Sequence, residues 1–167
     1  MPDQPLHFPE PSLELREFAV TKAREVREWV GVNGGSNGDF VGGRADDVDG
    51  GLALILEGIQ SSLADAVGSF SQDLARYGDL SESDAHEVFA AAHAWTAVIS
   101  RTVAEVYAPA SPFPGSWAGW GRRVTAKLQR LAATLGPILR AAAKASGATG
   151  ASVSISFPWG MSASINW

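Results

Sequence analysis

The residues whose types and spacing could support chemistry lie in a glycine-rich stretch and on one predicted helix. Residues 34–38, Gly-Gly-Ser-Asn-Gly, match the G-x-S-x-G pattern of a nucleophile elbow. That elbow needs a strand before its serine and a helix directly after it, within a parallel sheet. Here a predicted helix precedes the serine and further glycines follow it, so we interpret the match as fortuitous.

The same stretch carries four aspartates that could form a partial cation site. They are Asp39, Asp46, Asp47 and Asp49. A calcium loop counted from Asp47 would place glycine at its sixth position and glutamate at its twelfth. The sequence has Leu52 and Gly58 at those positions, so a solvated acidic loop is the interpretation that we favour.

His86 and His93 lie on the same face of a predicted helix. The axial rise between them is about 10.5 Å, which one metal ion cannot bridge unless the helix is distorted. The chain contains no Glu-x-x-His pair of the kind that dimetal bundles use. We therefore predict no catalytic, cofactor-binding or metal-binding residue, and we expect a protein that is not an enzyme and uses no cofactor.

Charge is distributed unequally along the chain. Residues 1–105 hold all 18 carboxylates and 7 basic residues, for a net charge of −11, whereas residues 106–167 hold 6 basic residues and no acidic one. Either the two parts neutralise each other within one fold, or the basic part meets an anionic partner. The candidate contacts for an anionic surface are Arg122, Arg123, Lys127, Arg130, Arg140 and Lys144.

Length and composition are typical of one globular domain. The chain has 167 residues, 46% of them hydrophobic, and no cysteine, which excludes a disulfide scaffold and a thiolate metal site. The N-terminus lacks the basic and apolar regions of a signal peptide, and no apolar run is long enough to indicate a transmembrane helix. We therefore expect a cytoplasmic protein. High alanine, glycine and arginine usage is typical of a GC-rich bacterial genome.

Hydrophobic periodicity predicts a mainly α fold, a four-helix bundle-like domain with a long Gly/Asp-rich loop and a C-terminal antiparallel β-hairpin. The predicted helices span residues 11–30, 52–77, 82–107 and 120–145. Eight glycines and four aspartates predict a flexible loop over residues 31–51. The chain then divides into an extended segment, residues 1–10, a helical bundle, residues 11–145, and a hairpin, residues 146–167.

Capping residues support these boundaries. We expect Gly31 to end the first helix, Asp49 to cap the second and Gly78 to follow it. Ser81 begins the third helix in a capping-box pattern.

The third and fourth helices carry the clearest apolar seams, with spacings that alternate between four and three residues. The residues that we predict to be buried are Trp95, Ile99, Leu128, Leu131 and Leu135. Pro137 removes a backbone hydrogen bond and clashes with the preceding turn, so we expect the fourth helix to kink or break near Ala133.

The C-terminal residues alternate strictly between apolar and polar. Apolar side chains occupy every second position of residues 153–157 and 161–167, with serine or asparagine between them. This period predicts two strands, and Pro158-Trp159-Gly160 predicts a three-residue loop with Gly160 in a left-handed conformation. The expected cross-strand pairs are Phe157 with Met161, Ile155 with Ala163 and Val153 with Ile165. A lone hairpin is marginal in water, so its apolar face must be covered.

Two further patterns point to partners. Trp117-Ala118-Gly119 resembles the tripeptide in the turn of the small helical hairpins of the WXG family. That similarity covers only about residues 82–145, and the other helices and the hairpin are foreign to it, so we favour aromatic packing of Trp117 and Trp120. The basic helix could contact nucleic-acid phosphates, but the chain is acidic overall and shows no recognition motif, which disfavours nucleic acid.

Two functional hypotheses follow. The first is a non-enzymatic interaction or self-assembly module, a homo-oligomer joined through its C-terminal hairpin, whose cations face its own acidic half. The candidate assembly face is Val153, Ile155, Phe157, Trp159, Met161, Ile165 and Trp167. The alternative is a membrane-active protein, interfacial or pore-type, which uses the amphipathic helix 120–145 and the hairpin 151–167 as a peripheral membrane contact. Spanning strands need about 9–11 residues, so surface binding is the favoured form of this alternative.

Overall fold

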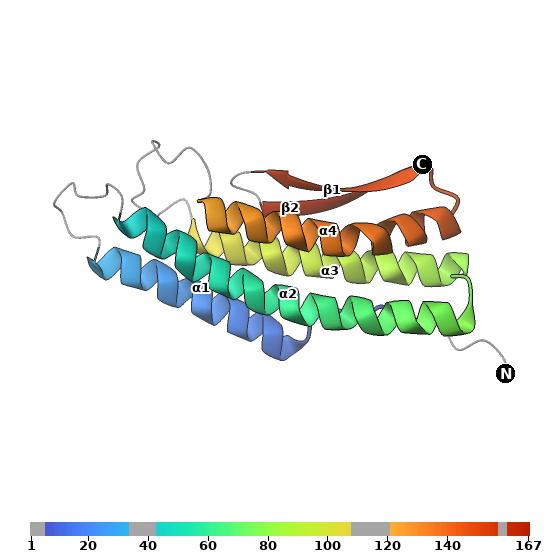
Figure 1. The fold of residues 1–167 in the computed structure, drawn as a ribbon, viewed down its shortest axis with the longest axis horizontal. Coiled ribbons are helices and arrows are strands. Elements are labelled where there is room, and N and C mark those ends of the chain that lie inside the picture. Colours follow the sequence, from blue (N-terminus) through green and yellow to red (C-terminus); the bar gives the residue numbers. More distant parts are fainter. Residues whose placement is uncertain (1–5, 34–42, 108–120, 157–159) are drawn as a thin grey trace.

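The computed structural model describes residues 6–33, 43–107, 121–156 and 160–167, and for residues 29–33 and 43–47 it describes the backbone alone. Within these ranges the chain forms four helices and one antiparallel hairpin (Figure 1). The elements are α1 (Leu13–Asn33), α2 (Gly43–Tyr77), α3 (Glu82–Val106), α4 (Arg122–Ala145), β1 (Gly150–Ser156) and β2 (Gly160–Asn166). The predicted fold class is confirmed.

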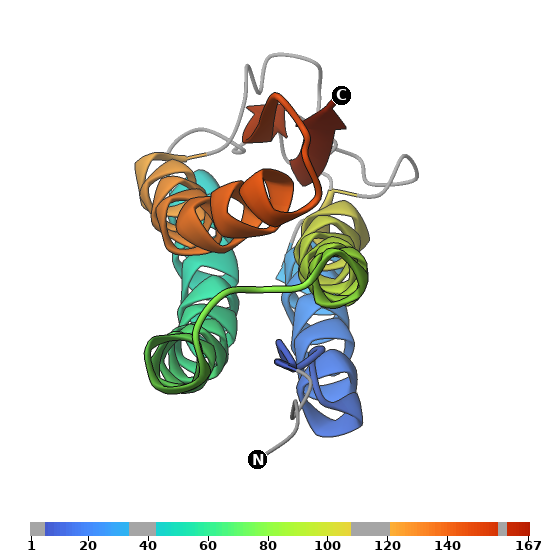
Figure 2. The same cartoon turned by 90° about the vertical axis from the view of Figure 1, so that its right-hand side faces the viewer.

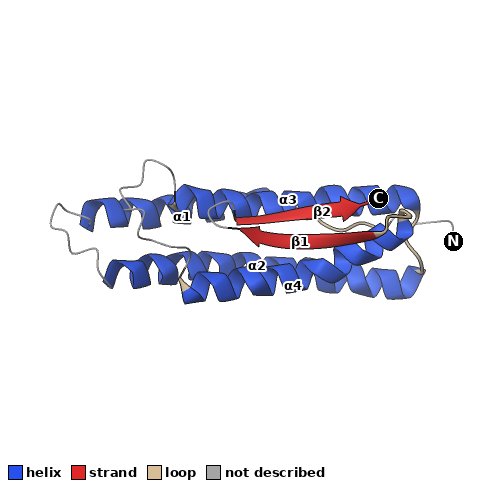
Figure 3. Ribbon diagram, turned by 90° about the horizontal axis from the view of Figure 1, so that it is seen from above, coloured by secondary structure: helices blue, strands red, loops and turns tan. Residues whose placement is uncertain are grey.

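The four helices form an elongated bundle. α1 packs against α2 and α3, and α4 packs against the same two helices from the opposite corner. The end-on view shows the connection from α2 to α3 crossing the bundle diagonally (Figure 2). The hairpin lies over α3 and α4, with β1 along α4 and β2 along α3 (Figure 3).

The predicted loop 31–51 is partly helical, which corrects both of its boundaries. α1 continues past Gly31 to Asn33, and α2 begins at Gly43 rather than at residue 52. Residues 34–42 lie outside the described residues.

Close packing between helices explains why α2 tolerates its glycines. A Cβ at Gly51 would lie 3.0 Å from Cγ2 of Val26, and a Cβ at Gly58 would lie 3.2 Å from Cε1 of Phe18. Both glycines therefore let α1 approach α2. Tertiary packing here outweighs the low intrinsic helix propensity of glycine, which was the basis of the loop prediction.

The residues that we predicted to be buried form part of the core, and the N-terminal segment before α1 contributes further buried side chains. Trp95, Ile99, Leu128, Leu131 and Leu135 are all buried, as predicted. Phe8 is 1% exposed and packs edge-on against Phe70 with ring centroids 5.6 Å apart. The indole N–H of Trp95 donates to the carbonyl of Pro9 at 2.8 Å. The segment thus packs against α2 and α3 where they extend beyond the start of α1 (Figure 1).

The helix ends follow the predicted capping chemistry at two of the expected positions. The Oγ of Ser81 accepts a hydrogen bond from the N–H of Asp84 at 3.1 Å, and Gly78 follows α2 with φ +95°. Pro137 lies inside α4, which remains a continuous helix. Its C-terminal part leans toward α3 (Figures 2 and 3), so the helix bends but is not interrupted.

The hairpin forms in a register that differs from the prediction by two residues. Ile155 is opposite Met161 and Val153 is opposite Ala163. A shift of two residues keeps every side chain on its predicted face, because the alternation has a period of two. The two faces were therefore predicted correctly and the pairing was not.

Gly160 explains where β2 begins. It has φ +84°, as expected for a left-handed residue, but it is the first residue of β2 rather than part of the loop. A Cβ at Gly160 would lie 3.0 Å from Cα of Ser100 in α3. Glycine is favoured at this first position of β2 because its backbone is left-handed and passes close to Ser100.

Candidate functional site

The described residues do not bring the candidate catalytic or metal-binding residues together into one site. Residues 34–38 lie outside the described residues, as do residues 117–119, the tripeptide that resembles the turn of the WXG family. His86 and His93 are exposed on α3, and the His86 ring lies against the Trp167 ring with centroids 6.3 Å apart. In the described part of the chain, no three His, Cys, Asp or Glu side chains are grouped so that they could hold a metal ion.

Asp49 caps a helix other than its own. It lies inside α2 and is 7% exposed. Its Oδ2 accepts from the N–H of Arg123 at 3.1 Å, and its Oδ1 accepts from the N–H of Val124 at 3.0 Å. These N–H groups belong to the first turn of α4, whose N-cap residue, Gly121, supplies no side-chain hydrogen bond. The prediction that Asp49 caps the second helix is therefore wrong.

Of the four aspartates that could form a partial cation site, only Asp49 has a side chain that the structure describes. Asp39 and the side chains of Asp46 and Asp47 lie outside the described part of the chain. The carboxylate of Asp49 is occupied by two N–H donors, so it serves as a structural acceptor.

Asp49 joins three elements at one end of the bundle. A Cβ on Gly121 would overlap the Asp49 carboxylate, so this position requires glycine. Burial, and secondly the negative charge of Asp49, raise the pKa of Tyr107 from 10.0 to about 12. Tyr107 is the C-cap residue of α3, so the carboxylate of α2 acts on the end of α3 and on the start of α4.

The six basic residues of α4 divide into two groups. The Nζ of Lys127 lies 3.7 Å from Oε1 of Glu57 on α2, and Arg123 lies against Gly50 of α2. The other four are exposed and form no ion pair with a carboxylate of the described residues. These four, which we name the α4 ridge, are Arg122, Arg130, Arg140 and Lys144. Internal neutralisation by the acidic half is therefore partial.

The bundle covers most of the apolar face of the hairpin. Met161 is 4% exposed, and Val153, Ile155 and Ile165 are partly buried against the core. Trp167 remains 69% exposed, and Phe157 and Trp159 lie outside the described residues. The helices of the same chain therefore bury most of the apolar face that we expected to be covered.

Ser100 of α3 binds the outer edge of β2. Its Oγ donates to the carbonyl of Met161 at 2.6 Å and accepts from the N–H of Met161 at 3.1 Å. The backbone groups of Met161 therefore point away from β1. Because this direction alternates along an antiparallel strand, the partner of Met161, Ile155, also directs its backbone groups outward.

β1 also has an outer edge, on the side away from β2. By the same alternation, Ala151, Val153 and Ile155 direct their N–H and C=O groups outward. Within the described residues the sheet has two strands, so no strand pairs with this edge.

The outward face of the hairpin is an uncharged array of hydroxyl groups. The Oγ atoms of Ser152 and Ser164 are 2.9 Å apart, and those of Ser154 and Ser162 are also 2.9 Å apart. All four serines are exposed. The face is polar, and none of these four side chains would repel an identical surface.

Sequence reasoning missed the tertiary roles of Asp49 and Ser100. A signal existed for Asp49, because a helix that begins after Gly121 has free N–H groups and must find an acceptor elsewhere. Ser100 gave no such signal, since a serine within a helix most often bonds its own backbone or water.

Comparisons with protein-family models, with curated proteins and with solved structures found no match to this chain.

Proposed function

We propose that the protein is a non-enzymatic self-assembly module whose copies join through the outer edge of β1. The observation that carries this proposal is that no strand pairs with that edge within the described residues and that β1 carries no residue of the kind that protects an edge. Residues 150–156 contain neither a charged residue nor a proline, and their pairing with β2 is regular, without a bulge. Soluble proteins usually protect an edge strand by one of these devices or by covering it.

The two edges of the hairpin differ, which favours β1 over β2. Ser100 satisfies both backbone groups of Met161 on the edge of β2. The corresponding groups of Val153 and Ile155 on β1 have no strand partner within the described residues. A second strand would supply hydrogen bonds that the first copy lacks.

The partner that fits this edge is β1 of a second copy. Antiparallel pairing of the two β1 strands relates the copies by a twofold axis, which closes the assembly as a dimer. The resulting sheet has the order β2–β1–β1–β2, in which each β1 strand has a strand partner on both sides.

A pair of matched substitutions tests the proposal. Ser154 and Ser162 face each other across the hairpin and share one hydroxyl contact at 2.9 Å. Ser154→Lys and Ser162→Lys each remove that contact and add one charge to the outward face. Only Ser154→Lys places its charge on β1, beside the dimer axis, where like charges on neighbouring strands repel.

We expect light scattering after size exclusion to give a dimer mass for the wild type and for Ser162→Lys, and a shift toward monomer for Ser154→Lys. Thermal melts of the variants serve as the folding control. A wild-type protein that stays monomeric at about 100 μM, or two variants with the same mass, would refute pairing through β1.

A second candidate function is adhesion to an anionic membrane surface, and the exposure of the α4 ridge favours it. A basic residue near such a surface contributes about 1 kcal/mol, so four together change the binding constant by roughly a thousandfold. The apolar face of α4 is buried in the bundle, and no described helix has the length and apolar content that crossing a bilayer requires. The candidate is therefore electrostatic adhesion alone.

Liposome co-sedimentation tests this second candidate. Phosphatidylserine vesicles should bind the wild type at low salt, and binding should fall as salt rises, because exposed charge is screened over about 8–10 Å at moderate ionic strength. Reversing the four ridge residues to glutamate should abolish binding without changing the melt. A wild type that ignores the vesicles at low salt would remove this candidate.

A further inference from the structure

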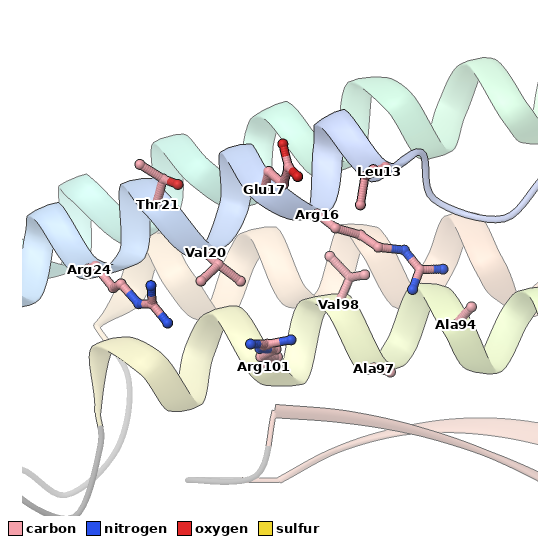
Figure 4. A pocket seen from close by; sticks show the side chains of 10 residues that line it. All are labelled: Leu13, Arg16, Glu17, Val20, Thr21, Arg24, Ala94, Ala97, Val98 and Arg101. Carbon is pink, nitrogen blue, oxygen red and sulfur yellow. The ribbon is translucent and has the colours of Figure 1, made fainter.

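A groove of about 630 Å³ lies between α1 and α3 and is open to solvent along one side (Figure 4). Two helices supply its whole lining. The lining residues are Leu13, Arg16, Glu17, Val20, Thr21 and Arg24 of α1, and Ala94, Ala97, Val98 and Arg101 of α3. Its volume is within the range of pockets that bind ligands, roughly 300–1,000 Å³.

The floor of the groove is formed by apolar side chains, and those on α3 are small. Val20 and Val98 point into the gap between the helices (Figure 4). Ala94 and Ala97 keep the ridge of α3 small, so that a third element can approach both helices. At one end of the lining, Leu13 is 69% exposed, which leaves a large apolar side chain available for contact.

The rim of the groove is cationic. Arg16 and Arg24 reach from α1 toward α3, and Arg101 lies between them along the groove (Figure 4). The one carboxylate of the lining, Glu17, points away from α3 (Figure 4). The ligand therefore meets three guanidinium groups above an apolar floor.

Two of these arginines have carboxylate partners within the chain, and the third, Arg101, has none among the described residues. Arg16 is 3.6 Å from the carboxylate of Glu10, and Arg24 is 2.9 Å from that of Glu105, which Arg27 also approaches at 3.9 Å. Arg101 is exposed and forms no ion pair with any carboxylate of the described residues. Guanidinium groups bind carboxylates in a bidentate manner, and carboxylates are the anionic groups of unmodified acidic side chains.

The spacing of the charges selects the class of ligand. Leu13 to Arg24 spans about 16 Å along α1, or three helical turns. A fatty acid offers one carboxylate at one end, whereas the three arginines are distributed along the groove. A helix with small apolar residues on one face and carboxylates beside that face matches both the floor and the rim.

We propose that the groove between α1 and α3 binds an acidic amphipathic helix of a partner protein. The floor buries the apolar face of that helix, and Arg16, Arg24 and Arg101 pair with its carboxylates. This site is separate from the β1 edge, so the protein can bind the helix whether or not its copies assemble.

The probe for this proposal is a fluorescein-labelled synthetic peptide of about 16 residues, long enough for four helical turns. It carries an alanine–leucine stripe flanked by glutamates. One control peptide has the same composition in an order that destroys the stripe, and a second replaces each glutamate by glutamine. Fluorescence anisotropy with the full chain measures binding, and we expect it for the first peptide only.

Two pairs of variants locate the site. Arg101→Glu should weaken binding about tenfold or more, as expected for reversing an exposed charge at a binding surface, whereas Arg130→Glu on α4 should not change it. Ala97→Trp should fill the floor and weaken binding at any salt concentration. Ala104→Trp, also exposed on α3 but outside the groove, is its control. Thermal melts of all four should match the wild type.

Several outcomes would overturn the proposal. The first is equal binding of the reordered peptide, and the second is binding that neither Arg101→Glu nor Ala97→Trp reduces. A third is no peptide binding together with saturable binding of dodecanoate below its micelle concentration, which would assign the groove to a single-chain amphiphile. A fourth is no binding of either probe.

Discussion

Replacing Asp49 tests whether its carboxylate on α2 stabilises the first turn of α4. Its carboxylate accepts from the N–H groups of Arg123 and Val124 at 3.1 and 3.0 Å. Losing an N-cap acceptor costs about 0.5–2 kcal/mol, and a buried N–H left without a partner costs about 1–3 kcal/mol. Since the N–H of Val124 is buried, Asp49→Ala should lower the free energy of unfolding by about 2–4 kcal/mol.

A double-mutant cycle sharpens this prediction. Gly121→Ala should also destabilise the fold, because its Cβ would overlap the Asp49 carboxylate. Once that carboxylate has been removed, only the Cβ of residue 49 still lies close to the added methyl group, at 2.7 Å, so the methyl group should cost less than it does in the presence of Asp49. The double variant Asp49→Ala/Gly121→Ala should therefore lose less free energy than the sum of the single losses, by about 0.5–3 kcal/mol.

Urea denaturation followed by circular dichroism measures all of these variants. The matched control is Asp65→Ala, which removes an exposed aspartate from the same helix and should change the free energy of unfolding by less than about 0.5 kcal/mol. The reasoning is refuted if Asp49→Ala and Asp65→Ala have equal effects, or if the two changes at Asp49 and Gly121 are additive.

Three further substitutions test the core and the titration of Tyr107. Leu131→Ala should cost about 2–5 kcal/mol in urea melts, because Leu131 is fully buried, whereas Leu54→Ala, at a leucine 70% exposed, should cost almost nothing. Phe8→Ala should cost about 3–5 kcal/mol if the N-terminal segment is part of the core, and the exposed Leu13→Ala is its control. The raised pKa of Tyr107, about 12 against 10.0, means that the folded state holds this proton more tightly than the unfolded state. That contribution of about 3 kcal/mol is complete below pH 10 and is lost as the pH rises through 12. Tyr107→Phe should remove this part of the alkaline stability loss and the corresponding change in absorbance at 295 nm; an unchanged pH profile would contradict the assignment.

The sequence was sufficient to predict that the four helices exist, because each seam has one period over many residues, but not where α1 ends and α2 begins. The spacing around Leu128 and Leu131 identified both the helix and its buried face, and the alternation of residues 153–167 identified both faces of the hairpin. Local signals of this kind depend only on neighbouring positions. They therefore predicted the elements and their faces without the tertiary structure.

What the sequence did not predict depends on contacts between distant residues. The glycines of residues 31–51, Gly51 among them, indicated a loop, because the packing of Val26 of α1 against Gly51 cannot be read from the sequence. The approach of Gly160 to Ser100 is a contact between distant residues, and the period of two in the sequence could not distinguish the observed register from one shifted by two residues. The groove between α1 and α3 was not predicted because Arg16, Arg24 and Arg101 come from helices far apart in the sequence.

Intermolecular distances between spin labels test the central claim, that copies join through β1, most directly. The chain has no cysteine, so Ser154→Cys and Ser162→Cys each provide a single labelling site. In the order β2–β1–β1–β2 the two β1 strands are about 4.8 Å apart laterally, and the two β2 strands are separated by three such spacings, about 14 Å. We expect pulsed dipolar spectroscopy to give a shorter distance for label 154 than for label 162, by roughly 10 Å. Equal distances, the reverse order, or no intermolecular coupling would contradict the assembly.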